Sequence, residues 1–135
     1  MLAKPFIKWV GGKSQLLEEI REKYPQRIEK YCEPFVGGGA VLFDVLSKFQ
    51  PNEVLINDIN KELINTYSQI KDNCPGMIAQ LSELQNVYKN HTVEENKEFF
   101  YEKRNQYNEL KVNGNVAENL EKAVLFIFLN KTCFN

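Results

Sequence analysis

Hydrophobic positions in the first half of the chain follow the pattern of a βαβ unit. Short apolar runs at residues 28–33 and 53–57 predict two strands, the second of the buried, parallel kind. Residues 40–49, which lie between them, are apolar nearly all round and predict a buried helix. Two parallel strands joined by one crossover helix form a βαβ unit, which we expect to be right-handed.

The chain ahead of this unit has a weaker pattern. Residues 4–10 are short and mixed and predict a brief strand, which ends at Gly11-Gly12. Ser14 is a suitable N-cap for a helix that ends near Tyr24-Pro25. The apolar face of this helix is formed by Leu16, Leu17 and Ile20.

From residue 60 onward the spacing of apolar residues is helical. One stripe consists of Leu63, Ile64, Tyr67 and Ile70, and a second consists of Met77, Ile78, Leu81 and Leu84. Pro75 lies near the first turn of the second helix, where proline is well tolerated.

Two further helices complete this part of the sequence. Thr92 and Glu95 predict a capping box for a long charged helix at residues 93–111, which ends at Asn113-Gly114. A last helix at residues 116–130 has a stripe formed by Leu120, Ala123, Val124, Ile127 and Phe128. The segment 86–115 is polar, and we interpret it as a candidate mobile helical insertion.

Composition places few limits on function. The 135 residues are enough for one domain, and 43% hydrophobic with 26% charged residues is ordinary for a soluble protein. The net charge of -1 excludes a uniformly basic nucleic-acid-binding surface, so contact with nucleic acid needs a local patch.

Cysteine usage and the N-terminus indicate a cytoplasmic protein. The cysteines Cys32, Cys74 and Cys133 form no C-x-x-C pair, which argues against a zinc site and a disulfide framework. Three unpaired thiols suit a reducing compartment. No apolar segment follows the N-terminus, and no run approaches the ~18 apolar residues of a membrane helix. We therefore expect no signal peptide, no membrane association and no metal.

The loop at residues 33–39, Glu-Pro-Phe-Val-Gly-Gly-Gly, is the strongest candidate for chemistry. Glycines let the backbone approach a ligand closely, and the helix that follows offers unpaired N–H groups to a carboxylate or phosphate. A dinucleotide fingerprint, G-x-G-x-x-G, fits Gly37 and Gly39 but needs a third glycine where Leu42 stands. This departure argues against a NAD-type protein.

Asp58 follows the second predicted strand, 19 residues past Gly39. A carboxylate at this point can accept hydrogen bonds from ribose hydroxyls, a device that NAD sites and S-adenosylmethionine sites share. The alternative is a plain turn with a solvated aspartate, which leaves the joint occurrence of loop and acid unexplained.

Residues 8–14, Lys-Trp-Val-Gly-Gly-Lys-Ser, imitate the end of a phosphate-binding P-loop. The spacing excludes that motif, because its first glycine falls on Ile7. Trp9 can stack on a purine or cap an aliphatic ligand, and Lys13 can meet a carboxylate. Taken singly, a core tryptophan and a solvated lysine are the simpler interpretations.

Taken in order, these motifs resemble a known family. Lys-Trp-x-Gly-Gly-Lys, Glu-Pro-Phe-x-Gly-Gly-Gly and Asn-Asp-x-Asn (residues 57–60) are similar to DNA adenine-N6 methyltransferases of the GATC-methylating type, the D12 class. Residues 128–135 resemble the segment ahead of that family's DNA-recognition elements. The resemblance implies an α/β fold: a Rossmann-like S-adenosylmethionine-dependent methyltransferase half-domain followed by a mostly helical segment. It also implies double-stranded DNA as the partner of the complete protein.

The resemblance assigns roles to single residues. Lys13 would lie near the methionine carboxylate of S-adenosylmethionine, Asp58 would bind the ribose hydroxyls, and Ile59 would lie against the adenine. The residues expected at the cofactor are Trp9, Lys13, Glu33, Pro34, Phe35, Gly37, Gly39, Asp58 and Ile59. The residues expected at DNA are Lys8, Phe134 and Asn135.

One family motif has no counterpart here. Family members carry an Asp-Pro-Pro-Tyr-type motif further downstream that holds the flipped adenine, and this sequence contains no two adjacent prolines. We therefore expect an N-terminal part of a methyltransferase, inactive alone, with no catalytic residue to assign. Residues 1–60 would belong to the cofactor-binding α/β domain, and residues 61–135 would lead into a truncated DNA-recognition domain.

Such a part is expected to self-associate or to need the missing C-terminal half. Three alternatives stay open beside the enzyme: a non-catalytic S-adenosylmethionine or nucleotide-binding module, a NAD-type Rossmann protein and a structural helical scaffold.

Overall fold

The computed structural model describes residues 2–133, which form two compact units. The first unit ends at Ile59 and the second begins at Asn60. Phe134 and Asn135, which we expect at DNA, lie outside the described residues. No helix of the described part is long and apolar enough to cross a membrane.

The N-terminal unit contains the predicted βαβ unit. Its elements are the 3-10 helix η1 (Lys13–Leu16), α1 (Leu17–Arg21), β1 (Lys30–Glu33), α2 (Ala40–Phe49) and β2 (Glu53–Ile56). β1 and β2 pair in parallel, with Lys30 opposite Glu53 and Glu33 opposite Ile56. The prediction of two parallel strands around a helix at residues 40–49 is therefore confirmed, and the small parallel sheet with mostly helical surroundings is compatible with an α/β fold.

The core of this unit forms around α2. Its buried hydrophobic side chains are Ile7, Val36, Val41, Leu42 and Val45. Leu42 is buried where a dinucleotide fingerprint would have its third glycine. The ring of Phe6 meets that of Phe43 edge to face, with 6.5 Å between centroids, so the irregular N-terminal segment also packs on α2.

Four local predictions in this unit are wrong. Residues 4–10 form no strand, because the chain turns: Gly11 has a φ of 72°, and the N–H of Gly12 donates to the carbonyl of Trp9. Ser14 is not an N-cap but lies inside η1, whose N-cap is Gly12. The helix after it ends at Arg21 rather than near Tyr24.

The fourth wrong prediction concerns the second strand, which is not buried. Val54 and Leu55 point to opposite faces of the sheet and are 41% and 66% exposed. A strand that is buried on both faces needs a layer on each side. The apolar sequence of β2 therefore predicted a strand correctly but did not predict that its side chains are exposed.

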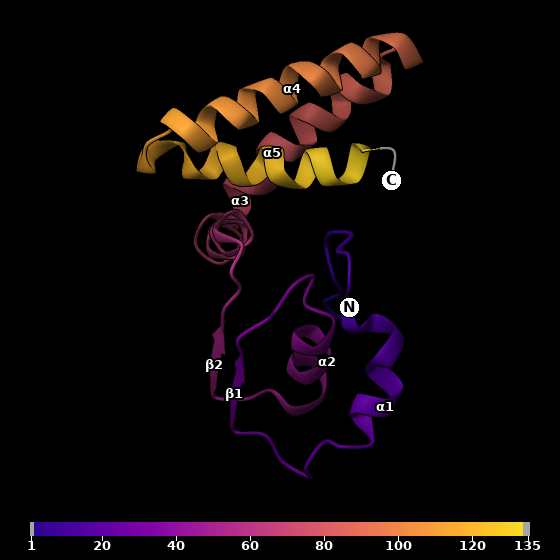
Figure 1. Cartoon of the computed structure of the whole chain (residues 1–135), viewed down its shortest axis with the longest axis vertical. Coiled ribbons are helices and arrows are strands. Elements are labelled where there is room, and N and C mark those ends of the chain that lie inside the picture. Colours follow the sequence, from indigo (N-terminus) through magenta and orange to yellow (C-terminus); the bar gives the residue numbers. More distant parts are fainter. Residues whose placement is uncertain (1, 134–135) are drawn as a thin grey trace. The chain divides into compact units, whose positions relative to one another are not determined.

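The C-terminal unit is helical. Its elements are α3 (Lys61–Asn90), α4 (Val93–Asn113), the 3-10 helix η2 (Val116–Glu118) and α5 (Asn119–Thr132), and α5 packs against both α3 and α4 (Figure 1). α3 is interrupted at Asn73, whose φ of -133° and ψ of 34° are not helical, just ahead of Pro75. The two predicted stripes lie on the two sides of this interruption.

The packing of α5 on α3 accounts for the core of this unit. Met77, Ala123 and Val124 are buried there, surrounded by Ile70, Leu81, Leu84, Leu120 and Ile127. A Cβ on Gly76 would lie 3.2 Å from Leu120 Cδ2, so a side chain there would crowd α5. Ile78, predicted in the same stripe, is 60% exposed.

The predicted capping box at the start of α4 is confirmed. The Thr92 hydroxyl accepts from the Glu95 N–H, and the Glu95 carboxylate accepts from the Thr92 N–H. The mobility of segment 86–115 stays a prediction.

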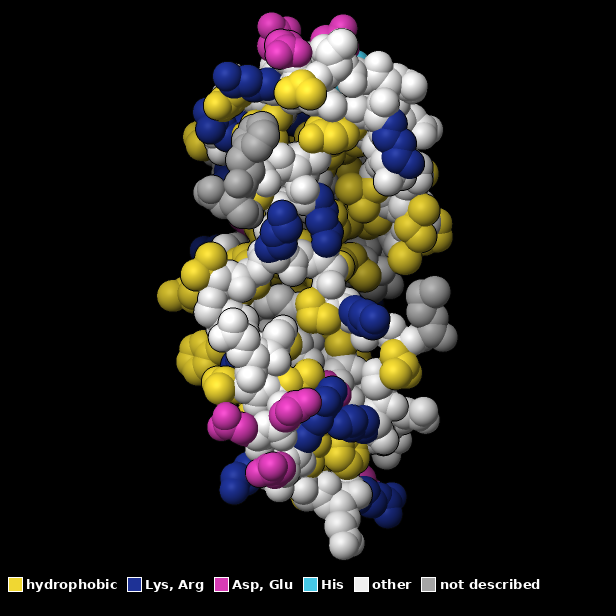
Figure 2. All heavy atoms as spheres, turned by 90° about the vertical axis from the view of Figure 1, so that its right-hand side faces the viewer, with side chains coloured by type: hydrophobic (Ala, Val, Ile, Leu, Met, Phe, Trp, Pro, Cys, Tyr) yellow, Lys and Arg dark blue, Asp and Glu magenta, His cyan; other side chains and the backbone are white. Residues whose placement is uncertain are grey.

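Figure 2 shows one face of the molecule, on which hydrophobic side chains reach the surface between Lys and Arg side chains.

Candidate functional site

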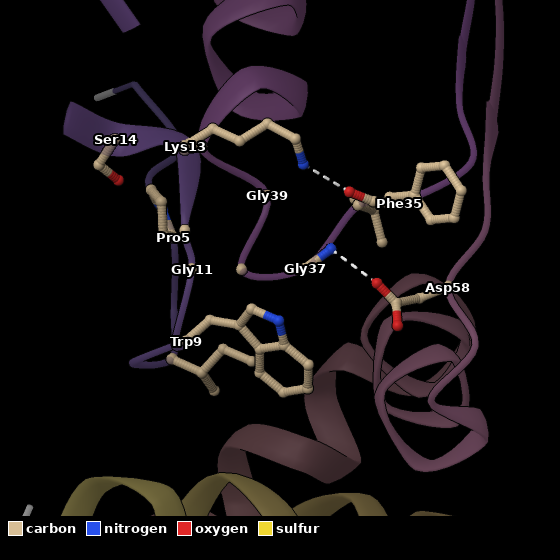
Figure 3. Close-up of a pocket in the computed structure, with 14 residues that line it drawn as sticks. Pro5, Trp9, Gly11, Lys13, Ser14, Phe35, Gly37, Gly39 and Asp58 are labelled. Atoms are coloured by element: carbon tan, nitrogen blue, oxygen red, sulfur yellow. Dashed lines mark hydrogen bonds between the residues drawn. The ribbon is translucent and has the colours of Figure 1, made fainter. Parts of the chain in front are cut away.

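The predicted motifs of the N-terminal unit meet around one cavity of about 200 Å³ (Figure 3). Its walls come from three segments: residues 5–14, residues 35–40 and Asp58. The first segment leads into η1, the second joins β1 to α2, and Asp58 follows β2. The two parallel strands therefore bring the glycine loop and Asp58 to the same edge of the sheet.

The glycine loop is fixed to the chain that follows β2. The N–H of Val36 donates to the carbonyl of Asn57 over 2.9 Å, and the N–H of Gly37 donates to Asp58 Oδ2 over 3.0 Å (Figure 3). Gly37 and Gly39 have φ values of 52° and 83°, in the left-handed region that favours glycine. Asp58 therefore holds the loop that we expect to carry the ligand.

Trp9 packs against this loop from the other side. A Cβ on Gly37 would lie 2.9 Å from Trp9 Cδ1, and one on Gly38 would lie 3.2 Å from Trp9 Cβ. In Figure 3 the indole lies against the loop at Gly37. The glycines are thus required by the close approach of this ring as well as by their φ values.

Lys13 is not a solvated surface lysine. Its ammonium donates to the carbonyl of Phe35 over 2.6 Å and lies 3.4 Å from Glu33 Oε1. The Glu33 side chain is 8% exposed, and its other oxygen, Oε2, accepts from the Tyr31 hydroxyl over 2.7 Å. Burial, together with this hydrogen bond, raises the pKa of the Tyr31 phenol well above its usual range.

A second ionic cluster joins α1 to α2. The Arg21 guanidinium donates to both oxygens of Asp44, the closest contact being 2.7 Å, and the Tyr24 hydroxyl donates to Asp44 Oδ2 over 3.0 Å. The Asp44 side chain is 7% exposed. The hydrogen bonds from Arg21 hold the pKa of Asp44 below its usual value, while burial raises the pKa of Tyr24 to about 12.

Most of the predicted cofactor residues lie at the cavity. Trp9, Lys13, Phe35, Gly37, Gly39 and Asp58 line it. Phe35 does so with its backbone, because its side chain is 71% exposed and points away from the cavity in Figure 3. Glu33 lies behind Lys13 instead of in the wall.

Other predicted residues do not line the cavity. Pro34 forms part of the turn between Glu33 and Phe35, and Ile59 is 92% exposed. Lys8, which we expect at DNA, is exposed.

Three features of the site were not predicted from the sequence: Tyr31, the Arg21–Asp44 pair, and the place of Ser14 in the cavity wall. Ser14 lines the cavity from η1. Tyr31 precedes Glu33 by two residues in β1, and this spacing places both side chains on one face of a strand. That spacing was the available signal for Tyr31. No comparable signal links Arg21 with Asp44.

Metal chemistry receives no support from the described residues. Between residues 2 and 133, no three His, Cys, Asp or Glu side chains are grouped so that they could hold a metal ion. Cys32 and Cys74 are exposed free thiols.

Comparison with known proteins identifies the family. A model of the D12 class N6 adenine-specific DNA methyltransferases matches residues 9–135, so the chain belongs to this family. The family membership that the order of the sequence motifs predicted is thereby confirmed.

Individual relatives agree with this assignment. The type II methyltransferase M.MjaIII of Methanocaldococcus jannaschii is 43% identical over the whole chain and 47% of its own length. The type II methyltransferase M1.LlaDCHI of Lactococcus lactis is 35% identical, and the DNA adenine methylase of Haemophilus influenzae is 33% identical. Each of these two alignments covers 98% of this chain, with 42% and 41% of the relative. The chain therefore spans less than half the length of these curated relatives.

Proposed function

We propose that this chain is the S-adenosylmethionine-binding part of a DNA adenine-N6 methyltransferase, with the Rossmann-like half-domain in its N-terminal unit. The observation that carries the proposal is the meeting of Trp9, Lys13, the glycine loop and Asp58 around one cavity. When bound, the cofactor supplies the methyl group, so the protein has to contribute binding and orientation.

The chemistry of the cavity fits the polar end of this cofactor. An ammonium at Lys13 suits the methionine carboxylate, and a carboxylate at Asp58 suits ribose hydroxyls. The cavity of about 200 Å³ is smaller than the ~300–1,000 Å³ of typical ligand pockets, so it would enclose only part of the molecule. Ile59, at 92% exposed, would then lie against an adenine that is only partly enclosed.

Double-stranded DNA is the partner that we propose for the complete protein, with Lys8, Phe134 and Asn135 at the interface. Before transfer, such an enzyme has to flip the adenine out of the duplex, at a cost of roughly a few kcal/mol. No adjacent proline pair occurs in the 135 residues. This observation favours cofactor binding without methyl transfer by this chain alone, as in a non-catalytic binding module.

Titration calorimetry with S-adenosylmethionine tests the cofactor assignment. Asp58→Asn is the informative variant, because an amide oxygen can still accept from the Gly37 N–H while the negative charge is lost. We expect the affinity to fall at least about tenfold, as for the loss of a charged hydrogen-bond partner. Asp72→Asn, an exposed aspartate in α3, is the matched control and should bind as the parent does.

Two results would contradict the proposal. If the parent chain binds NADH but not S-adenosylmethionine, the NAD-type alternative is correct; if it binds neither, the cavity of this chain has no cofactor function. Methyl transfer to adenine-containing duplex DNA above a protein-free blank would disprove the predicted inactivity.

A further inference from the structure

We propose that Tyr31 is a positioning residue of the candidate cofactor site, which fixes the Lys13 ammonium through Glu33. The polar contacts of Tyr31 do not depend on the proposed function, whereas their effect on cofactor binding rests on it. Tyr31 belongs to none of the sequence motifs on which the resemblance to the family rests. It reaches the site from β1, on the side of Glu33 away from Lys13.

Both oxygens of the Glu33 carboxylate are engaged. Oε2 accepts from the Tyr31 hydroxyl over 2.7 Å, and Oε1 faces Lys13 Nζ at 3.4 Å. Lys13 Nζ in turn donates to the Phe35 carbonyl in the glycine loop over 2.6 Å. The result is a continuous chain of polar contacts from a strand side chain to the backbone of the loop.

The physical need for Tyr31 follows from the burial of Glu33. A carboxylate that is 8% exposed is costly unless donors satisfy it. The Tyr31 phenol is protonated at neutral pH like any tyrosine, and its raised pKa extends the range of pH over which it stays a donor. By holding Oε2, it determines which way the carboxylate plane faces and directs Oε1 to Lys13.

This orientation matters because lysine cannot orient itself. Its ammonium sits on a flexible four-carbon stem and is placed by its partners. Of its three N–H donors, one is used by the Phe35 carbonyl and one is directed to Glu33. The third is then available for a carboxylate in the cavity, which is the group that the methionine end of the cofactor offers.

The same unit contains a matched control. Tyr24, Asp44 and Lys48 form a second tyrosine–carboxylate–lysine set, in which Tyr24 donates to Asp44 and Lys48 Nζ lies 3.5 Å from Asp44 Oδ2. The two lysine side chains are similarly exposed, 38% for Lys13 and 42% for Lys48. Deleting the Tyr24 hydroxyl removes a tyrosine–carboxylate hydrogen bond elsewhere in the unit, where Arg21 also holds both oxygens of Asp44. It therefore controls for general effects of a Tyr→Phe replacement in this unit.

The first experiment needs no ligand. Trace acetylation followed by mass spectrometry measures the reaction rates of Lys13 and Lys48 in the parent, Tyr31→Phe and Tyr24→Phe. We expect Tyr31→Phe to raise the rate at Lys13 roughly fivefold, the effect of one hydrogen bond, and to leave Lys48 unchanged. Tyr24→Phe should leave Lys13 unchanged. An unaltered Lys13 in Tyr31→Phe, or an equal rise at both lysines, would overturn the inference, since the latter means general loosening.

The second experiment uses ligands. In Tyr31→Phe we expect the affinity for S-adenosylmethionine to fall roughly fivefold, while that for 5′-methylthioadenosine, which lacks the amino-acid end, stays the same. The loss should disappear in a Lys13→Met background. Equal losses for both ligands would show a merely structural role and overturn the inference. Failure of the parent to bind S-adenosylmethionine would refute the proposed function instead. The acetylation rates alone would then test whether Tyr31 positions the Lys13 ammonium.

Discussion

Replacing Gly37 by alanine tests whether the glycine loop is shaped by Trp9. The residue has a φ of 52°, and its N–H donates to Asp58 over 3.0 Å. An added Cβ would lie 2.9 Å from Trp9 Cδ1 and 3.2 Å from Trp9 Nε1. Alanine therefore meets two separate penalties at this position: one from its own backbone and one from the indole.

The two penalties can be given magnitudes. A left-handed backbone costs a residue with a Cβ roughly 1–2 kcal/mol. Displacing a packed side chain by one extra carbon costs about 1–3 kcal/mol. Gly37→Ala should thus lower the free energy of unfolding of the N-terminal unit by about 2–5 kcal/mol, which is a large share of the stability of an ordinary domain.

Gly11→Ala is the matched control. Gly11 also has a positive φ, 72°, but a Cβ there would meet nothing within 4 Å. It should show only the backbone penalty, roughly 1–2 kcal/mol. The difference between the two variants isolates the contact with Trp9.

Urea unfolding followed by tryptophan fluorescence measures both variants, because Trp9 is the only tryptophan of the chain and lies in the N-terminal unit. Hydrogen exchange of β1 and α2 amides extends the measurement to a Trp9→Ala background. There, Gly37→Ala should cost no more than Gly11→Ala does. The reasoning is refuted if Gly37→Ala and Gly11→Ala are equally stable in the presence of Trp9.

Two further predictions concern the stability of the N-terminal unit. Because Arg21 lowers the pKa of Asp44, the ionised carboxylate contributes stability above its unfolded pKa of 3.8, and that contribution is lost as the pH falls through the lower folded value. Urea midpoints of the parent should therefore fall more steeply below about pH 4 than those of Asp44→Asn. Parallel plots of midpoint against pH for the two proteins would contradict a stabilising role of the ionised Asp44. Gln50, at the end of α2, has a φ of 49°, so Gln50→Gly should raise the free energy of unfolding by about 1 kcal/mol, and an unchanged or lower value would contradict the strain.

Local patterns in the sequence correctly predicted those helices whose starting points are marked by neighbouring residues. Helix α2 begins directly after a glycine loop, and α4 begins at a capping box, so both starting points were predicted from a few neighbouring residues. Residues 4–10 lacked such signals. Their conformation depends on a turn closed by Trp9 and Gly12 and on packing of Phe6 against α2.

Burial was predicted less well than secondary structure, for a physical reason. Periodicity shows which side chains share a face, but the covering layer comes from elsewhere in the chain. Leu55 and Ile78 fit their patterns and are nonetheless 66% and 60% exposed. Exposed apolar faces of this kind are consistent with the expected self-association, which stays a prediction.

The candidate site was predicted as a set of motifs, whereas the contacts that organise it were not. Parallel strands place the ends of β1 and β2 at one edge, so the proximity of the glycine loop and Asp58 followed from the order of elements. The partners of Lys13 did not follow, because a carboxylate from β1 and a carbonyl from the loop become neighbours only once η1 is folded against them.

The two tyrosine–carboxylate–lysine sets suggest how the fold supports this arrangement. Lys13 lies in η1, which continues directly into α1, and the Arg21–Asp44 pair ties the end of α1 to α2. Because the glycine loop leads into α2, this pair joins the segments that follow Lys13 and the loop, while Glu33 and Phe35 hold Lys13 itself. The ammonium is thus held close to the loop by direct contacts and by a tie about two helical turns away. Replacing Asp44 should therefore disturb the cavity by displacing α1. Replacing Tyr31 should disturb it only by displacing the Lys13 side chain.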